Sequence, residues 1–169
     1  MTDKTLLKAR KFAAKHHAGK LYDSHPYTFH LDMTEEVIDR FIPEDHPRFT
    51  LLKVCSQLHD VVEDTDVTVE QIESEFGTDV AMIIAAVTDS SGTNRKDRKS
   101  KTYPRIRAAG DDAIIVKLAD RIANIEHSSV NSKRLYDMYV SEHHIFYGAL
   151  FDVSVGHHTS MWDHILTLI

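Results

Sequence analysis

Apolar residues recur at helical spacing along most of the chain. In residues 4–18 they lie between lysines and arginines, and residues 33–41 repeat the pattern. A continuous apolar run at 79–88 predicts a buried helix, because a lone buried strand would have no partner. Residues 111–126 and 131–151 predict two more helices, and a last one ends the chain. No stretch alternates as a strand does, so we predict an all-α fold, a helical bundle.

Turn-forming residues mark where several of these helices begin and end. Gly19 closes the first helix, and the loop that follows it places His30 just ahead of the second. Thr68 and Gln71 have the spacing of a capping box, which predicts the start of a short helix. Gly77 is the expected end of that helix.

Three further segments are defined by their polar residues. Residues 90–103 are polar and include Gly92, so we expect a loop there. Asn131 is of a type that favours helix N-caps, and we expect it to begin the long helix that follows. From Phe49 an apolar run leads into an acidic motif at residues 57–65, which predicts a core helix whose last turns carry the polar chemistry.

Length and composition fit one globular domain. The chain has 169 residues, 42% of them hydrophobic and 27% charged, so we treat residues 1–169 as a single domain. A net charge of −6 gives no general affinity for nucleic acid. We expect neither a signal segment nor a membrane span. The one cysteine, Cys55, lies in an apolar run, which suggests a buried thiol and a cytoplasmic protein. The oligomeric state is left open.

The acidic motif carries the strongest chemical signal. His59 and Asp60 are adjacent, and Glu63 and Asp64 follow four residues after each of them. Residues four apart on a helix share a face, so one face would carry an imidazole and three carboxylates. Like charges repel, and a divalent metal with nitrogen and oxygen ligands would offset that cost. Taken alone, His59-Asp60 fits a solvated acidic helix end better than a metal site.

A second polar group interrupts a later apolar helix. Asp120 and Asn124 are four residues apart and face the same way. By themselves they fit a salt-bridged aspartate and an exposed asparagine equally well. With His30, His59 and Asp60, however, Asp120 makes a set of two histidines and two aspartates from three predicted helices. We therefore expect these four side chains to bind one divalent metal and leave room for water.

These residues resemble the scattered ligands of the HD phosphohydrolase superfamily. Residues 59–65 strongly resemble the hydrolase motif of the RelA/SpoT homologues, and 72–87 and 116–124 also fit that family. The likeness covers residues 8–127, and the chain has no room for the synthetase domain of the long members. It is therefore similar to the small alarmone hydrolases. That resemblance implies an HD-type bundle and an enzyme that removes pyrophosphate from the 3′ position of ppGpp and pppGpp with manganese.

The resemblance also implies roles for individual residues. The metal would be held by the two histidines and two aspartates described above. Glu63 and Asp64 would orient or deprotonate the attacking water, and Asn124 would contact the nucleotide. Residue chemistry agrees, because a metal lowers the pKa of bound water and a nearby carboxylate can take the proton.

The chain departs from the family pattern ahead of the first metal histidine. The family usually places an arginine–lysine pair eight or nine residues before it, where the arginine packs on guanine, but here Leu21 and Tyr22 occupy those positions. Leu31 stands where a proline often follows the histidine. The metal chemistry is unaffected. The alternative function is therefore an HD-type phosphohydrolase for another nucleotide phosphate, with Tyr22 stacked on the base.

Residues 95–107 hold seven basic residues and one acid. Such runs are usually solvated surface, but a basic loop beside an acidic metal site can bind the phosphates that carboxylates repel. By family position, Arg95 and Lys99 are the expected phosphate contacts, and Tyr139 is expected at the far wall of the pocket. Two other functions are a non-catalytic module that senses nucleotide and a protein that binds nucleic acid. The sensor would not need water-activating carboxylates. A nucleic-acid binder would need aromatic residues interleaved in this segment.

Overall fold

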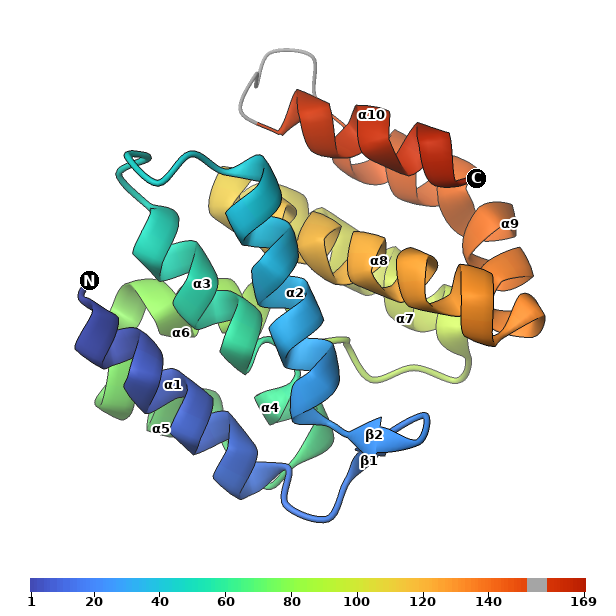
Figure 1. Cartoon of the computed structure of the whole chain (residues 1–169). Helices are drawn as coiled ribbons and strands as arrows, with labels where there is room; N and C mark the ends of the chain where they lie inside the picture. The colour runs from blue at the N-terminus through green and yellow to red at the C-terminus, as the bar shows by residue number, and fades with distance from the viewer. Residues whose placement is uncertain (152–157) are drawn as a thin grey trace.

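The computed structural model describes residues 1–151 and 158–169 and shows a bundle of helices (Figure 1). The all-α prediction is confirmed. Between the first two helices lies a small antiparallel hairpin made of β1 (Leu21–Tyr22) and β2 (His25–Pro26). The helices are α1 (Asp3–His16), α2 (Thr28–Phe41), α3 (Phe49–Leu58), α4 (Val61–Asp64), α5 (Val69–Phe76), α6 (Thr78–Val87), α7 (Arg95–Ala109), α8 (Asp111–Asn131), α9 (Lys133–Leu150) and α10 (Thr159–Leu168). Among the described residues, none of these helices is long and apolar enough to cross a membrane.

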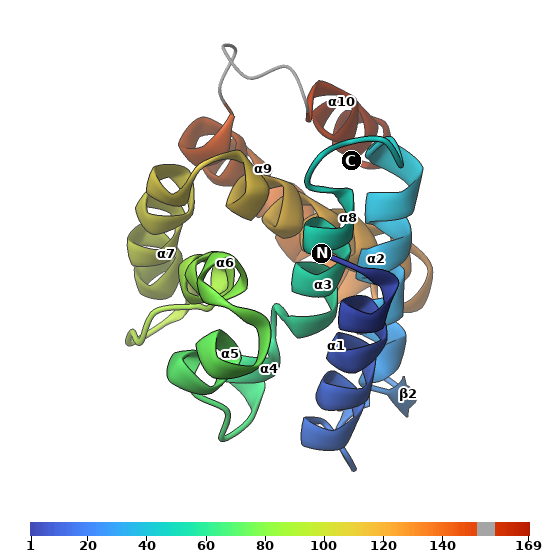
Figure 2. The ribbon, with the colours of Figure 1, turned by 90° about the vertical axis from the view of Figure 1, so that its left-hand side faces the viewer.

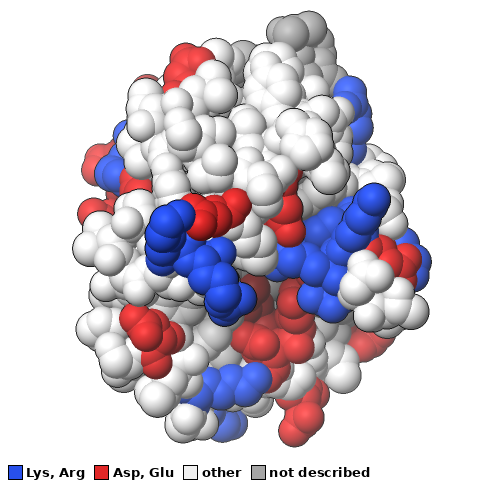
Figure 3. Space-filling view, turned by 90° about the vertical axis from the view of Figure 1, so that its right-hand side faces the viewer, with Lys and Arg blue, Asp and Glu red and all other residues white. Residues whose placement is uncertain are grey.

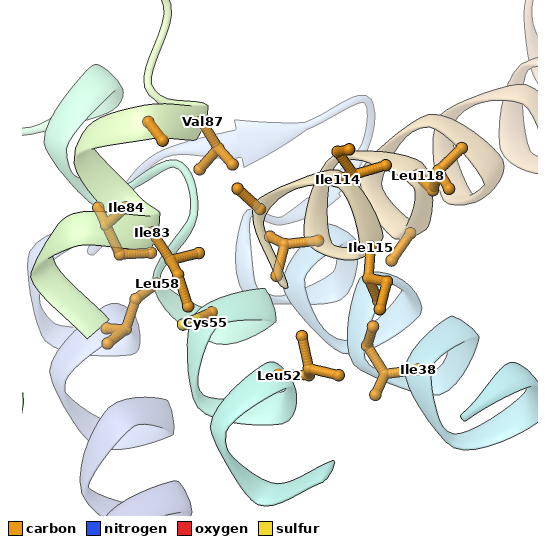
Figure 4. Close-up of a cluster of buried hydrophobic side chains, with 14 of the residues drawn as sticks. Ile38, Leu52, Cys55, Leu58, Ile83, Ile84, Val87, Ile114, Ile115 and Leu118 are labelled. Carbon is orange, nitrogen blue, oxygen red and sulfur yellow. The ribbon is translucent and has the colours of Figure 1, made fainter. Parts of the chain in front are cut away.

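The long helix α8 lies at the centre of the bundle. It packs against α2, α3, α6, α7, α9 and α10. Figure 4 shows buried side chains from four of the helices, with Ile38 of α2 and Ile115 of α8 on one side of Leu52 of α3 and Ile84 of α6 on the other, near Leu58 of α3. Burying each such side chain contributes about 1.5–3 kcal/mol. This core therefore fixes α2, α3 and α8, the helices nearest the predicted metal ligands, relative to one another.

The acidic motif lies at a break in the helix. α3 ends at Leu58, and α4 has only four residues, so the prediction of one continuous helix is wrong at this point. His59 and Asp60 nevertheless keep right-handed helical angles, with φ of −59° and −100°. The amide of Asp64 donates to the carbonyl of Asp60 at 2.8 Å. The four-residue spacing thus still places Asp64 one helical turn after Asp60.

Two predicted helix boundaries are confirmed. The Thr68 side chain accepts a hydrogen bond from the Gln71 amide at 3.3 Å, and the Gln71 side chain accepts one from the Thr68 amide at 2.9 Å. This is a capping box, and it starts α5. Gly77 ends α5 with a φ of 91°, a left-handed conformation that glycine adopts without strain. The chain then turns directly into α6, so that α5, α6 and α7 pack in sequence (Figure 2).

Two expectations about helix ends are wrong. His30 lies inside α2, which begins at Thr28. The hairpin makes the preceding connection short, because the Tyr27 amide donates to the Lys20 carbonyl at 3.1 Å. Asn131 is the last residue of α8 and does not cap α9. Its side chain donates to the His127 carbonyl at 2.9 Å, one helical turn earlier on α8.

The basic segment is helical, although a loop was expected. Its helix, α7, begins after Asn94, whose side chain accepts a hydrogen bond from the Asp97 amide at 3.0 Å. The buried residues of α7 are Thr102, Tyr103 and Ile106, all in its second half. The first half therefore shows no apolar periodicity, which is why the sequence pattern hid the helix.

Candidate functional site

Four side chains from separate segments place ring nitrogens and carboxylate oxygens close together. His30 Nε2 lies 3.2 Å from His59 Nε2 and 3.5 Å from Asp60 Oδ2. His59 Nε2 and Asp60 Oδ2 are 3.1 Å apart. Asp120 Oδ1, from α8, lies 3.3 Å from His30 Nε2 and 3.7 Å from His59 Nε2. The structure thus brings together all four side chains that the sequence marked as metal ligands.

The spacing of these atoms suits a single metal ion. With bonds of about 2.1 Å, neighbouring ligand atoms on one ion lie about 3.0–3.4 Å apart. One donor atom each from His30, His59 and Asp60 lies within 4.8 Å of the other two. Asp120 falls outside that tight group but is within reach of both histidines. A rotation of the Asp120 carboxylate would bring its oxygen into the group. Two imidazoles with two carboxylates suit Mn, Fe or Zn.

Protonation balances the charge of this cluster in the metal-free protein. Burial alone would lower the pKa of His59, but the charge of Asp60 and hydrogen bonds with Asp120 and Asp60 raise it to about 10. Burial would raise the pKa of Asp60, yet the charge of His59 and hydrogen bonds from both histidines hold it well below its usual range. A proton on His59 therefore offsets part of the carboxylate charge when no metal is bound.

Lys117 is a member of the site that the sequence analysis missed. Its Nζ lies 2.7 Å from Asp120 Oδ2, one helical turn earlier on α8. Burial would lower the pKa of Lys117, but Asp120 and Asp60 raise it above its ordinary value. A lysine three residues before a functional aspartate in an otherwise apolar helix was the available signal. Lys117 keeps Asp120 ionised.

Beside the cluster is a pocket lined by the last two carboxylates of the acidic motif. Glu63 and Asp64 reach it from α4. Glu63 Oε2 accepts a hydrogen bond from the Asp89 amide at 3.0 Å. Burial, with the nearby charge of Asp60, raises the pKa of Glu63 against the lowering effect of that hydrogen bond. Tyr27, also in the pocket, donates to Asp60 Oδ2 at 2.6 Å.

Arg95 and Lys99 line the same pocket, but each is held by an internal carboxylate. Arg95 Nε and Nη2 lie 2.7 and 3.1 Å from the two oxygens of Glu142. Lys99 Nζ lies 2.8 and 2.9 Å from those of Asp89. Burial and then the charge of Lys117 lower the pKa of Lys99 to about 8. Figure 3 shows the resulting surface, with acidic side chains in a central hollow and basic ones beside it.

Asn124 and Tyr139 also line the pocket. The Asn124 side chain is already bonded, since Oδ1 accepts from the Tyr22 hydroxyl at 2.9 Å and Nδ2 donates to Asp120. Tyr139 is contacted by the guanidinium of Arg121, 4.6 Å from its ring centre. Tyr27 and Arg121 also line the pocket and were not assigned from sequence, because their partners Asp60 and Glu142 lie 33 and 21 residues away in the chain.

The family model described as HD domain matches residues 9–146. The fruit-fly (Drosophila melanogaster) guanosine-3′,5′-bis(diphosphate) 3′-pyrophosphohydrolase MESH1 is 37% identical over 79 residues, which cover 47% of this chain and 44% of that protein. The human (Homo sapiens) protein of that name is 30% identical over 130 residues, covering 71% and 67%. The Aquifex aeolicus guanosine-3′,5′-bis(diphosphate) 3′-pyrophosphohydrolase is 30% identical over 128 residues, covering 70% of this chain and 17% of that enzyme.

A solved structure shares the fold. It is described as "A metazoan ortholog of SpoT hydrolyzes ppGpp and plays a role in starvation responses", and it superposes with a TM-score of 0.80 at 22% identity. The superposition covers 99% of this chain and 96% of that one. The two chains therefore share the fold.

Metal binding is expected to displace a proton and to tighten as the pH rises. His59 can ligate a metal only when its Nε2 is deprotonated, and its pKa of about 10 keeps that form scarce at neutral pH. Between about pH 7 and pH 9 the affinity of the metal-free protein for Mn²⁺ should rise by up to about tenfold per pH unit. Calorimetric titration in buffers of different ionisation enthalpy measures both the affinity and the proton release.

One variant tests this expectation and a second serves as its control. Asp60→Asn removes one of the four donors and should bind Mn²⁺ weakly at every pH, whereas Asp39→Asn changes an exposed carboxylate on α2 and should behave as wild type. An affinity that does not vary with pH would mean that no ligand histidine is protonated in the metal-free protein.

Proposed function

The chain belongs to the HD domain family, and we propose that it is a metal-dependent hydrolase that removes pyrophosphate from the 3′ position of ppGpp and pppGpp. The products would be GDP or GTP. The observation that carries the proposal is the cluster of two histidines and two aspartates beside a pocket lined by both carboxylates and cations. Relatives that carry the pyrophosphohydrolase name support the choice of substrate.

The metal would be held by His30, His59, Asp60 and Asp120, and we propose Mn²⁺ as the physiological ion. When bound, a divalent ion lowers the pKa of a coordinated water and polarises a phosphoryl oxygen. The protein supplies the donor set and its orientation. His59 is oriented by its Nδ1, which donates to the Ser56 carbonyl at 2.7 Å, as is usual for metal-binding histidines.

Glu63 and Asp64 are the proposed acceptors of the proton from the attacking water. Both line the pocket within one helical turn of the metal ligands. The raised pKa of Glu63 makes it a stronger base than an exposed glutamate. The hydrogen bond from the Asp89 amide fixes one of its oxygens, and the other oxygen is the proposed proton acceptor.

Arg95, Lys99 and Asn124 are the proposed contacts to the nucleotide. A polyphosphate approaching the carboxylates of the site is repelled unless cations offset its charge. Arginine offers a two-pronged match to phosphate oxygens. Glu142 and Asp89 hold the two cations in the pocket before substrate arrives, so a phosphate must share them with these carboxylates.

One feature favours a second candidate function. Leu21 and Tyr22 stand where the family resemblance places an arginine–lysine pair whose arginine packs on guanine, and Leu21 is exposed. The same metal centre could then serve another nucleotide phosphate.

That residues 1–169 form one domain also stays a prediction, since the family model matches residues 9–146. The buried, free thiol of Cys55 supports a reducing, cytoplasmic setting.

A nucleotide panel tests the function directly. With Mn²⁺, the protein should release pyrophosphate from ppGpp and pppGpp and leave GDP and GTP. Chromatography of the nucleotide products and separate assays for phosphate and pyrophosphate identify the bond that is cleaved. Release of inorganic phosphate from another nucleotide, with ppGpp untouched, would favour the second candidate. Metal removal with a chelator should abolish either activity.

Glu63→Gln is expected to lose catalysis and to keep the metal. Removing a general base typically lowers kcat by about 10²-fold or more, while the four proposed ligands are unchanged. Elemental analysis of the purified variant and kcat under saturating substrate are the two measurements. Glu44→Gln, in the exposed connection between α2 and α3, is the matched control. Loss of metal and activity together would make Glu63 a ligand.

The Arg95→Ala/Lys99→Ala variant is expected to raise KM more than it lowers kcat. Hydrogen bonds to charged groups contribute about 1.5–3 kcal/mol each when shielded, and partial exposure of Arg95 reduces its share. We expect about a tenfold rise in KM at low salt and a smaller rise at high salt. Lys96→Ala/Lys101→Ala alters two exposed lysines of the same helix and is the control. An unchanged KM at low salt would make α7 ordinary solvated surface.

A further inference from the structure

Tyr22 contacts His30 directly and is linked to Asp120 through Asn124. Its ring stacks on the His30 imidazole, with ring centres 4.7 Å apart and planes 12° from parallel. Its hydroxyl donates to Asn124 Oδ1 at 2.9 Å. Both contacts come from β1 of the hairpin, at a position where the family resemblance expects a basic residue.

The two histidines of the cluster differ in what holds their rings. His59 is fixed by the hydrogen bond from its Nδ1 to the Ser56 carbonyl. His30 Nδ1 is buried and, within the described part of the chain, has no hydrogen-bond partner. A metal-binding histidine normally uses this second nitrogen to set its tautomer and orientation. The orientation of His30 therefore depends on its aromatic neighbours, of which Tyr22 is the one stacked in parallel.

The second contact of Tyr22 reaches Asp120. Asn124 Nδ2 donates to the Asp120 carbonyl at 2.9 Å and also to Asp120 Oδ1. The Tyr22 hydroxyl can donate only to the oxygen end of the amide, so it fixes which end of Asn124 faces Asp120. Asp120 Oδ1 is the same atom that lies 3.3 Å from His30 Nε2. Tyr22 therefore acts on both residues of the His30–Asp120 contact, on His30 by stacking and on Asp120 through Asn124.

We propose that Tyr22 is a positioning residue of the metal centre, which orients His30 by stacking and Asp120 through Asn124. The inference rests on the proposed metal-dependent function. It differs from the expectation that Tyr22 stacks on a nucleobase. One side of its ring is covered by His30, and His127 lies 5.0 Å away at 57°. The effect on catalysis then comes through metal occupancy and not through nucleotide affinity.

The test compares Mn²⁺ binding to metal-free wild-type protein and two variants by calorimetry. Tyr22→Phe keeps the stacked ring and removes the hydrogen bond to Asn124, and we expect several-fold weaker Mn²⁺ binding. Tyr22→Leu removes both contacts, and we expect a loss of about 10- to 100-fold, the usual effect of removing support behind a metal ligand. Tyr136→Phe is the matched control, because it deletes a hydroxyl that donates to the Leu168 carbonyl at 2.7 Å, away from the pocket.

A kinetic arm separates positioning from substrate contact. If Tyr22 acts through the metal, saturating Mn²⁺ should restore most of the activity of Tyr22→Phe with an unchanged KM for the nucleotide. A KM that stays high at saturating Mn²⁺ would overturn the inference in favour of a nucleotide contact, made by Tyr22 itself or through Asn124. Mn²⁺ affinity equal to wild type in both variants, with only a lower melting temperature, would reduce Tyr22 to a packing role. Failure of wild type itself to bind Mn²⁺ would overturn the proposed function as well.

Discussion

The burial of charge is the constraint on which the rest of this structure depends. Asp60 and Asp120 sit with two buried histidines in the interior of a helical bundle, and an ionised carboxylate there is costly unless it is paired. Lys117 and a protonated His59 supply that pairing in the metal-free protein. A divalent metal would supply it in the proposed enzyme. The apolar core of α2, α3, α6 and α8 serves this constraint because it holds donors from separate helices at fixed distances (Figure 4).

The cations that line the pocket are also paired with carboxylates of the protein. Lys99 is held by Asp89 and Arg95 by Glu142, so the cations beside the metal cluster are oriented before any ligand arrives. Such preorganisation lowers the cost of binding an anionic group, although each internal carboxylate also competes with that group. Asp89 has a further link, because its amide donates to Glu63. The proposed base and the proposed phosphate contact are therefore joined through one residue.

The hairpin and the residue that follows it supply two tyrosines to the site. Tyr27 donates to Asp60, while Tyr22 stacks on His30 and bonds Asn124. Relatives named as pyrophosphohydrolases share the family and a solved structure shares the fold, but this segment is where the chain departs from the family pattern. The hairpin therefore bears on the proposed metal centre through Tyr22, while the proposed phosphate contacts Arg95 and Lys99 come from α7.

The sequence by itself determined the strongly apolar helices, such as α6 and α8, and the capping box at Thr68, because these depend on residues near one another in the chain. It also singled out the two histidines and two aspartates, since their residue types and spacing are local signals. It missed α7, whose first half buries no apolar face. Only the tertiary structure decided the partners. Tyr22 and Asn124 are 102 residues apart and Arg95 and Glu142 are 47 apart. No local pattern encodes such a contact, because it exists only once the core has fixed the helices against one another.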